Sequence, residues 1–465
     1  KFDEVYPAAR SGAGLLAIAP QLLGSDRPRT YLVLIQNEDE LRPSGGFISA
    51  AARVTLSAGK IISLTVIDGN LVDDYARKPY DFPPDPLFTV MGSELWLFRD
   101  ANWSPDFPTS AREAAHLFDY GLGGGPFDGV IAINQRVVQS IVAAIDPVPI
   151  DNNTPALTAQ NLERSLRDAW GPQNYDVTTQ RKDFIAKMSQ AIMQRLLHSP
   201  EAVRWPILAR GLLDRLDSHD LLITLIDPAL DQSTFSDWNG SLQKSSGDYL
   251  MVVDTNLGFN KASAAISQTI SYAVAIESDR TIQAGVTIDY RNANPPQSGC
   301  QHFTAKYDIT TTYETLIDRC YYDYLRVLAP ANAQFSDSTP HAVPTEYLVT
   351  GIGTDGSISI TNELDKTSFG TFFVVERGAA LHTAVSYSLP ATLLTRDRDQ
   401  WVYHLIWQKE PGARAWPIEF AIAWPANWKL VSASPEPKSI SARSLIIARN
   451  LNTDLDIEVR FNEQQ

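Results

Sequence analysis

The hydrophobic pattern of this 465-residue chain changes near residue 230, and the change predicts two kinds of domain. In the first half, short continuous apolar runs alternate with segments of helical periodicity. A continuous apolar run of strand length is typical of a strand covered on both faces. We therefore expect an α/β domain, a mixed sheet with flanking helices, over residues 1–230. The apolar runs lie at 30–36 and 129–133, further strands at 47–56 and 60–67, and the helical segments at 110–120, 135–145, 159–170 and 182–197.

The second half is built from short segments in which apolar and polar residues alternate. Segments 264–276 and 284–291 show this pattern clearly, and turn residues separate them from similar segments downstream. Regularly spaced short strands of this kind predict one or two β-sandwiches. We expect a connecting segment over 231–256, a sandwich over 257–370 and a second sandwich over 371–465.

Composition excludes several classes of protein. The chain has 39 basic and 54 acidic side chains and a net charge of −15. Its negative electrostatic field therefore disfavours binding to nucleic acid. With 44% hydrophobic and 20% charged residues it can bury large cores and is not a disordered chain. No apolar run approaches the roughly 18 residues of a membrane span. The first six residues show no signal-peptide pattern, so we expect a processed or truncated N-terminus and membrane contact only through a segment before Lys1.

The chain has two cysteines, Cys300 and Cys320, and we expect them to form a disulfide, although spacing alone does not establish one. Closing this loop would stabilise the fold by about 3 kcal/mol in the chain-entropy model. A disulfide would also place the protein outside the cytoplasm. The seven scattered histidines and two cysteines do not show the spacing of a structural zinc site.

Two glycine-rich strings resemble nucleotide-binding motifs and are better explained as turns. GIGTDG at 351–356 is followed by a strand pattern, whereas a dinucleotide fingerprint opens a helix. GLGGG at 121–125 follows a helix and precedes a strand, which favours a helix C-cap over a phosphate cradle.

The string QNEDELRPSGGF at 36–47 leaves the carboxyl end of a buried strand, where open α/β sheets place ligands. Gly45 and Gly46 would let backbone N–H groups approach an anion, and Arg42 could bind one bidentately. The alternative is a hydrophilic turn with a local arginine–carboxylate pair.

Two further clusters of charged residues follow. Acids of this density either hold a hard cation or form caps and turns. A solvated helix start is the alternative for the second cluster. The first cluster comprises Arg99, Asp100, Asn102 and Asp106, with Asp68, Asp73 and Asp74 nearby, and the second comprises Arg167, Asp168, Asp176 and Arg181.

These strings resemble a family of bacterial and archaeal cell-envelope proteins known as domain of unknown function 4012. LIQNEDELRPSGGF at 34–47, RDANWSPDFPTS at 99–110 and FDGVIAI at 127–133 carry the resemblance, which is strong over about 30–150. NLGFNK at 256–261 and the β-rich half match more loosely. The family name implies a place in the cell envelope and no activity.

The order of elements is also similar to that of the LytR-CpsA-Psr family, which transfers glycopolymers from a polyprenyl-pyrophosphate carrier to the cell wall. FDGVIAIN at 127–134, PVPI at 147–150 and LTAQNL at 157–162 carry this likeness. It implies that Arg42, Arg167 and Arg181 bind pyrophosphate, with Asp176 in the family's Arg–Asp–Arg set, and that an aspartate holds Mg²⁺. This chain departs from the pattern, because RPSG at 42–45 lacks an aspartate and residues 66–68 lack an arginine. The late arginine pair is reduced to Arg181.

Two hypotheses about function follow. In the first, the chain is an extracytoplasmic glycopolymer transferase, with an acidic residue as general base. In the second, the α/β domain is a non-catalytic scaffold, and the sandwiches mediate surface assembly or glycan binding. An enzyme requires at least three of the arginines to converge on one cleft. The residues expected to act in the transferase are the catalytic set Arg42, Arg99, Asp100, Asp106, Arg167 and Arg181, the substrate-binding set Gly45, Gly46, Asn102 and Asp176, and the Mg²⁺ ligands Asp68 and Asp106.

Three glycosylation triplets begin at Asn102, Asn152 and Asn239. Glycosylation at these sites is possible only where the host has the glycosylation machinery.

Overall fold

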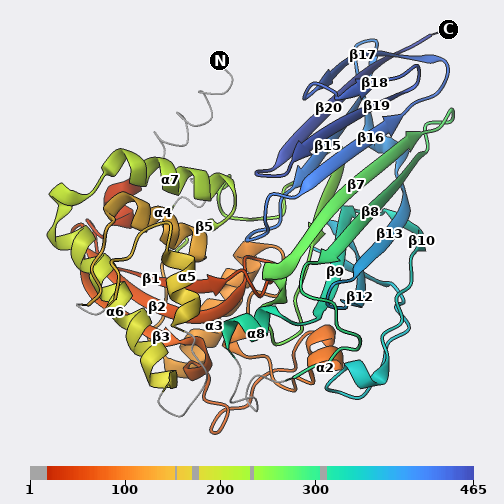
Figure 1. Cartoon of the computed structure of the whole chain (residues 1–465). Helices are drawn as coiled ribbons and strands as arrows, with labels where there is room; N and C mark the ends of the chain where they lie inside the picture. Colours follow the sequence, from red (N-terminus) through yellow and green to blue (C-terminus); the bar gives the residue numbers. More distant parts are fainter. Residues whose placement is uncertain (1–17, 152–153, 170–176, 231–234, 304–311, 465) are drawn as a thin grey trace.

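The computed structural model describes residues 18–151, 154–169, 177–230, 235–303 and 312–464, with the side chains of α6 described from residue 184 onward. Figure 1 shows an α/β part beside an elongated β part that carries the C-terminus. The elements of the α/β part are β1 (Arg29–Asn37), β2 (Phe47–Ser57), β3 (Lys60–Asp68), η1 (Gly69–Leu71), α2 (Asp85–Met91), η2 (Phe98–Asp100), α3 (Phe107–Leu122), β4 (Gly129–Ile133), α4 (Gln135–Ile145), α5 (Leu162–Asp168), α6 (Val177–His198), η3 (Pro200–Ala202), α7 (Trp205–Asp217) and β5 (Leu221–Leu225).

The α/β part is built on a five-stranded sheet of order β3-β2-β1-β4-β5. β1 and β4 are parallel, with Tyr31 opposite Gly129, and the other pairs are antiparallel. Leu32 and Leu34 pack under α3 on one face, while Tyr31 packs with side chains of α4 and α7 on the other. The mixed α/β domain predicted from the apolar runs is confirmed.

Several helix starts differ from the predicted ones. α3 begins at Phe107, three residues before the predicted segment 110–120, because the carboxylate of its N-cap Asp106 accepts from the Thr109 N–H at 3.0 Å. α5 begins later than expected. After α6, Pro200 opens a 3₁₀ turn and α7 follows.

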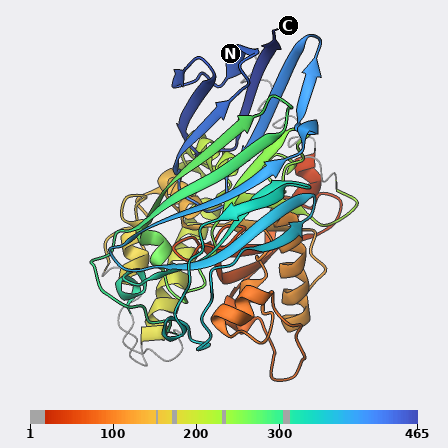
Figure 2. The same cartoon turned by 90° about the vertical axis from the view of Figure 1, so that its right-hand side faces the viewer.

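The β part begins with β6, a fully buried strand in the segment expected to be a connection. Figure 2 shows its long strands side by side. The elements are β6 (Asp248–Val253), η5 (Ala262–Ala265), β7 (Ile266–Ile276), β8 (Ile282–Asn292), α8 (Tyr313–Ile317), β9 (Tyr321–Pro330), β10 (Gln334–Ser338), η7 (Thr345–Tyr347), β11 (Ser359–Glu363), β12 (Lys366–Val375), β13 (Ala380–Leu389), η8 (Ala391–Leu393), β14 (Leu394–Asp397), β15 (Gln400–Gln408), β16 (Pro417–Ala423), β17 (Trp428–Ser434), β18 (Ser439–Ile440), β19 (Ser444–Asn450) and β20 (Leu455–Glu463).

These strands form a seven-stranded sheet, β10-β13-β8-β7-β16-β19-β18, and an eight-stranded sheet, β11-β12-β9-β6-β15-β20-β17. One hydrophobic core joins them, with Tyr272 and Phe420 from the first sheet and Tyr403 and Trp407 from the second. The predicted boundary at residue 370 falls inside β12, and strands from both sides of it share both sheets. The described strands therefore form one sandwich, because parallel pairs such as β6–β15 connect its early and late segments.

The predicted disulfide between Cys300 and Cys320 is present. GIGTDG leads into a strand, β11, and not into a helix, and GLGGG contains Gly123, the C-cap of α3, as predicted. Among the described residues, the structure contains no helix long and apolar enough to cross a membrane.

Candidate functional site

The loop after β1 lies where the α/β part meets the sandwich, and Arg42 is buried at this junction. Its guanidinium donates to the Asn256 carbonyl and lies 3.3 Å from Glu40 and 3.4 Å from Asp100. Lys261 binds the second oxygen of Glu40. Only 1% of Arg42 is exposed. Instead of binding a ligand as predicted, Arg42 belongs to a buried ion network that joins the α/β part to the sandwich.

The glycines of the same loop serve close packing. Gly45 has φ +133°, and a Cβ added there would lie 2.0 Å from the side-chain oxygen of Gln36. A Cβ on Gly412 would lie 1.8 Å from the Gly45 carbonyl, and one on Gly46 would lie 2.5 Å from the backbone of Asn37. The sequence predicts that these glycines let the backbone approach an anion. In the structure they let it approach other parts of the chain.

The first of the two charged clusters, around Arg99, also forms internal contacts. Asp100 lies between Arg42 and Arg99, whose Nε is 3.5 Å away. Asn102 is fully buried and donates to the Gly46 carbonyl at 2.7 Å, a position that closes it to glycosylation. The second oxygen of the capping residue Asp106 accepts from the Leu242 N–H at 3.1 Å.

The carboxylates expected to bind Mg²⁺ are engaged in the same way. Both oxygens of Asp106 accept hydrogen bonds, and Asp68 accepts from the Asn70 N–H at 2.9 Å. Within the described ranges, no group of three or more His, Cys, Asp or Glu side chains is arranged to hold a metal ion. The role of Asp68 and Asp106 as Mg²⁺ ligands stays a prediction.

The second charged cluster, around Arg167, is placed only in part. Arg167 lies 3.7 Å from Asp39, pairs with Glu163 and covers the ring of Tyr313 at 5.7 Å. Asp176 lies outside the described residues, as does Asn152, and the side chain of Arg181 is not described. The side chain of Asn239 accepts from the Ser241 N–H at 2.9 Å.

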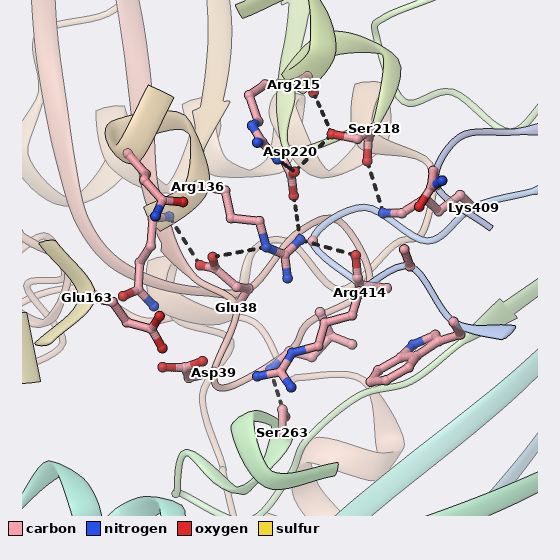
Figure 3. A pocket seen from close by; sticks show the side chains of 18 of the residues that line it. Glu38, Asp39, Arg136, Glu163, Arg215, Ser218, Asp220, Ser263, Lys409 and Arg414 are labelled. Carbon is pink, nitrogen blue, oxygen red and sulfur yellow. Dashed lines mark hydrogen bonds and ion pairs between the residues drawn. The ribbon is translucent and has the colours of Figure 1, made fainter. Parts of the chain in front are cut away.

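A cleft of about 540 Å³ lies between the α/β part and the sandwich, at the carboxyl edge of β1 and β4. This is the edge at which the pattern predicts a ligand. Figure 3 shows charged side chains of both signs turned toward this space. The cations that line it are Arg136, Arg215, Lys409 and Arg414, the acids are Glu38, Asp39, Glu163 and Asp220, and other lining residues include Gln135, Gln139, Ser218, Ser263, Trp416 and Asn452.

Asp220 organises the inner wall of the cleft. One of its oxygens accepts from Arg136 at 2.8 Å and the other from Arg215 at 3.1 Å. Asn134 and Ser218 add hydrogen bonds at 2.7 and 2.9 Å. Burial alone would raise the pKa of Asp220, but the positive charges of Arg136 and Lys409 and these hydrogen bonds leave the pKa below 3.8. Asp220 is therefore ionised and holds both arginines at the cleft wall.

Two cleft residues titrate near neutral pH. Burial raises the pKa of Glu38 to about 7, against the opposing attraction of Arg136, whose Nε lies 3.8 Å away. The Glu38 carboxylate accepts from the Gln135 N–H at 3.2 Å, at the N-terminus of α4. Burial lowers the pKa of Lys409 to about 8, and its ammonium donates to the Ser218 carbonyl at 3.0 Å.

The arrangement can hold an anionic group and exchange a proton with it. A carboxyl whose pKa lies near the working pH is suited to general acid–base catalysis. Arginine and lysine at one wall suit phosphate or carboxylate. Arg414 is exposed and is held by one described hydrogen bond, to the Ala264 carbonyl at 2.9 Å, so it can turn toward a ligand.

Sequence reasoning located the edge of the sheet but missed most of these residues. Gln135 and Arg136 follow the buried strand β4, so the same rule that singled out 36–47 could have found them. Lys409 and Arg414 carry no such signal, because their place depends on how β15 meets the α/β part.

Residues 26–170 match the family described as "Protein of unknown function (DUF4012)". No curated protein matches the chain. Among solved structures, a candidate nutrient-binding protein of Legionella pneumophila shares 9% identity, with 46% of this chain and 70% of that chain covered and a TM-score of 0.29. Lin1025 of Listeria innocua shares 12% identity over 48% and 85% of the two chains, with a TM-score of 0.27. An M1 zinc metallopeptidase of Deinococcus radiodurans shares 8% identity over 43% and 42%, with a TM-score of 0.21.

At these TM-scores the structural likenesses carry no argument about this chain. The LytR-CpsA-Psr resemblance is not tested by these matches and stays a prediction. The family predicted from the three strings is confirmed as a match over the segment that contains them, residues 26–170.

Proposed function

We propose that this chain is an extracytoplasmic cell-envelope protein whose cleft binds the phosphorylated end of a glycan, and that it transfers glycopolymers from a polyprenyl-pyrophosphate carrier. The observation that supports the proposal is the cleft wall, where Arg136, Arg215 and Arg414 lie near Glu38, whose pKa is about 7. The disulfide is compatible with a place outside the cytoplasm.

In this reaction an acceptor hydroxyl attacks the phosphorus next to the glycan. A new P–O bond joins the glycan phosphate to the acceptor, and the P–O bond to the polyprenyl phosphate breaks. Polyprenyl phosphate leaves, and the hydroxyl proton passes to the Glu38 carboxylate. The cleft cations would stabilise the charge that develops on the phosphoryl oxygens.

Magnesium would enter this cleft with the diphosphate. Mg²⁺ is usually held by substrate phosphates together with one or two carboxylates. Asp39 and Glu163 are the carboxylates at the α5 side of the cleft. Measuring binding with and without Mg²⁺ tests this part of the proposal.

A specific observation favours the second hypothesis, a non-catalytic surface-assembly or glycan-binding protein. Of the four arginines that the transferase hypothesis named, Arg42 and Arg99 share Asp100 away from the cleft, and Arg167 pairs with Asp39 and Glu163 at its edge. The predicted convergence of three named arginines on one cleft is thus absent among the described side chains. The transferase proposal depends on a different set of cations.

Farnesyl pyrophosphate tests the cleft directly. At 100 times its dissociation constant it should stabilise the wild type by about 2.7 kcal/mol. Arg414→Ala should weaken binding about tenfold or more, because a charged donor is lost. Arg449→Ala is the matched control, since Arg449 is exposed on β19 and donates only to backbone carbonyls among the described residues. Isothermal titration with and without Mg²⁺ measures both variants. Binding that is absent, or equal in both variants, would favour the non-catalytic hypothesis.

The pH dependence of binding should depend on Glu38. Its pKa near 7 means that it gains a negative charge between about pH 6 and 8, next to the proposed phosphate position. Relative to Glu38→Gln, which cannot ionise, the wild type should therefore lose affinity for farnesyl pyrophosphate as pH rises through 7. The comparison cancels the titration of the ligand itself. Parallel curves for the two proteins would remove Glu38 from the site.

A further inference from the structure

The outer strand of the α/β sheet, β3, is an open edge with an apolar face. β3 lies at the end of the strand order, and its nine residues pair only with β2 among the described strands. Among the described residues, the backbone hydrogen bonds outside helices and strands include none to β3. Strands of this length with free N–H and C=O groups readily accept another strand.

Three apolar side chains occupy alternate positions on this strand. Ile62, Leu64 and Val66 are 59%, 40% and 49% exposed. Leu64 lies opposite Val54 of β2, which in turn lies opposite Tyr31 of β1. Tyr31 is buried with side chains of α4 and α7, so these helices cover the same face over β1 but leave it bare over β3.

Most of the devices that protect an edge strand are absent between Ile61 and Ile67. This stretch, IISLTVI, contains no proline, glycine or charged residue. The one protecting device in this stretch is a β-bulge at Ile62, between Ile61 and Ser63, and residues 63–68 continue in regular register with β2. Natural edges are normally protected by lysine, proline or inward-pointing charge, so this edge is suited to a partner.

The charges at the two ends of β3 indicate what that partner is. Lys60 begins the strand and Asp68 ends it. In an antiparallel pair of two β3 strands centred on Leu64, Lys60 of each copy lies opposite Asp68 of the other, and Ile62 lies opposite Val66. Opposite charges and apolar pairs across strands both stabilise a sheet. A parallel arrangement would place like charges side by side.

We propose that two copies of this chain associate through antiparallel pairing of their β3 strands about a two-fold axis at Leu64. The two five-stranded sheets then form one continuous sheet. The apolar rows of the two copies become neighbours on one face. The contact is isologous, as in most homodimers.

The oligomeric state of the full chain tests this proposal. Light scattering after gel filtration in the micromolar range should show a dimer for the wild type. Leu64→Lys places two like charges opposite each other at the axis and should raise the dissociation constant at least about tenfold. Ile440→Lys is the matched control, since Ile440 is an apolar residue, 60% exposed, on the edge strand β18. A monomeric wild type, or equal dissociation by both variants, would overturn the proposal.

Two further variants test the register. Leu64→Cys should form an intermolecular disulfide with itself under oxidation, because residues opposite each other in antiparallel strands have Cα atoms about 4.5–5.5 Å apart. Both native cysteines are already paired, so the added thiol is the reporter. Ile440→Cys should not cross-link. Failure of Leu64→Cys to cross-link in a dimeric protein would exclude this register.

A charge exchange supplies an independent test of the antiparallel direction. Lys60→Asp alone and Asp68→Lys alone each place like charges opposite each other and should weaken the dimer. The double variant restores opposite charges and should recover it. Because Asp68 also caps η1, the melting temperature of each monomer is measured alongside. If the double variant dimerises more weakly than either single variant, antiparallel pairing is contradicted.

Discussion

Replacing Arg42 by alanine is expected to destabilise the protein by about 3–5 kcal/mol, because it leaves buried carboxylates without their counter-charge. Arg42 and its partners Glu40 and Asp100 are all buried. The same change removes the hydrogen bond to the Asn256 carbonyl, a contact between the α/β part and the sandwich. Most of the lost free energy of unfolding should therefore appear as unfolding of the junction between the two parts at a lower urea concentration.

Urea unfolding followed by tryptophan fluorescence measures this effect. Trp103 stacks on Tyr324 of the sandwich with ring centroids 5.8 Å apart, so it reports on the junction. Arg99→Ala is the matched control, since Arg99 approaches the same Asp100 but is 36% exposed at its side chain. An exposed pair contributes at most about 1 kcal/mol. Equal losses for the two variants would contradict the role assigned to Arg42.

The double variant Arg42→Ala with Asp100→Asn separates charge from packing. If the loss comes from the orphaned carboxylate, neutralising Asp100 should recover part of it. Recovery would appear as a coupling free energy between the two substitutions. Strict additivity would mean that Arg42 acts through its contact with Asn256 alone.

The sandwich is expected to be more stable in mild acid than at neutral pH, and Asp248 should account for about 3 kcal/mol of the difference. Burial raises the pKa of Asp248 from 3.8 to about 6, against the hydrogen bonds of Tyr272, Tyr403 and the Tyr249 N–H. A raised pKa in the folded state favours the protonated form. Its stabilisation is therefore complete below about pH 4 and is lost as pH rises through 6.

Comparing the wild type with Asp248→Asn isolates this contribution. Burial also raises the pKa values of Asp254, Asp323 and Glu410, which add to the same trend in both proteins. The difference in the free energy of unfolding between the two proteins should shift by about 3 kcal/mol in favour of the variant from pH 4 to pH 7.5. Asp279→Asn is the control, because Asp279 is exposed in the β7–β8 turn and its pKa is lowered by local hydrogen bonds. A difference that stays constant over this range would refute the assignment to Asp248.

The local features of the fold could be predicted from the sequence because they depend on residues near one another in the chain. The apolar run at 30–36 predicts a buried strand, and β1 is one, while Gln135–Ile145 follows the predicted helix residue for residue. The disulfide partners could be predicted because the chain contains only two cysteines. The division into two sandwiches could not, since β6 pairs with β15 more than 150 residues away.

The sequence by itself therefore determined the elements, the family of residues 26–170 and the sheet edge at which a site lies. Only the tertiary structure decided which charged residues face that site. Arg42 and Arg136 both follow buried strands at this edge, yet Arg42 packs against the Asn256 carbonyl while Arg136 lines the cleft. The difference arises where the sandwich meets the sheet, because a charge becomes buried or open according to the surface placed over it. No local pattern in the sequence records that surface.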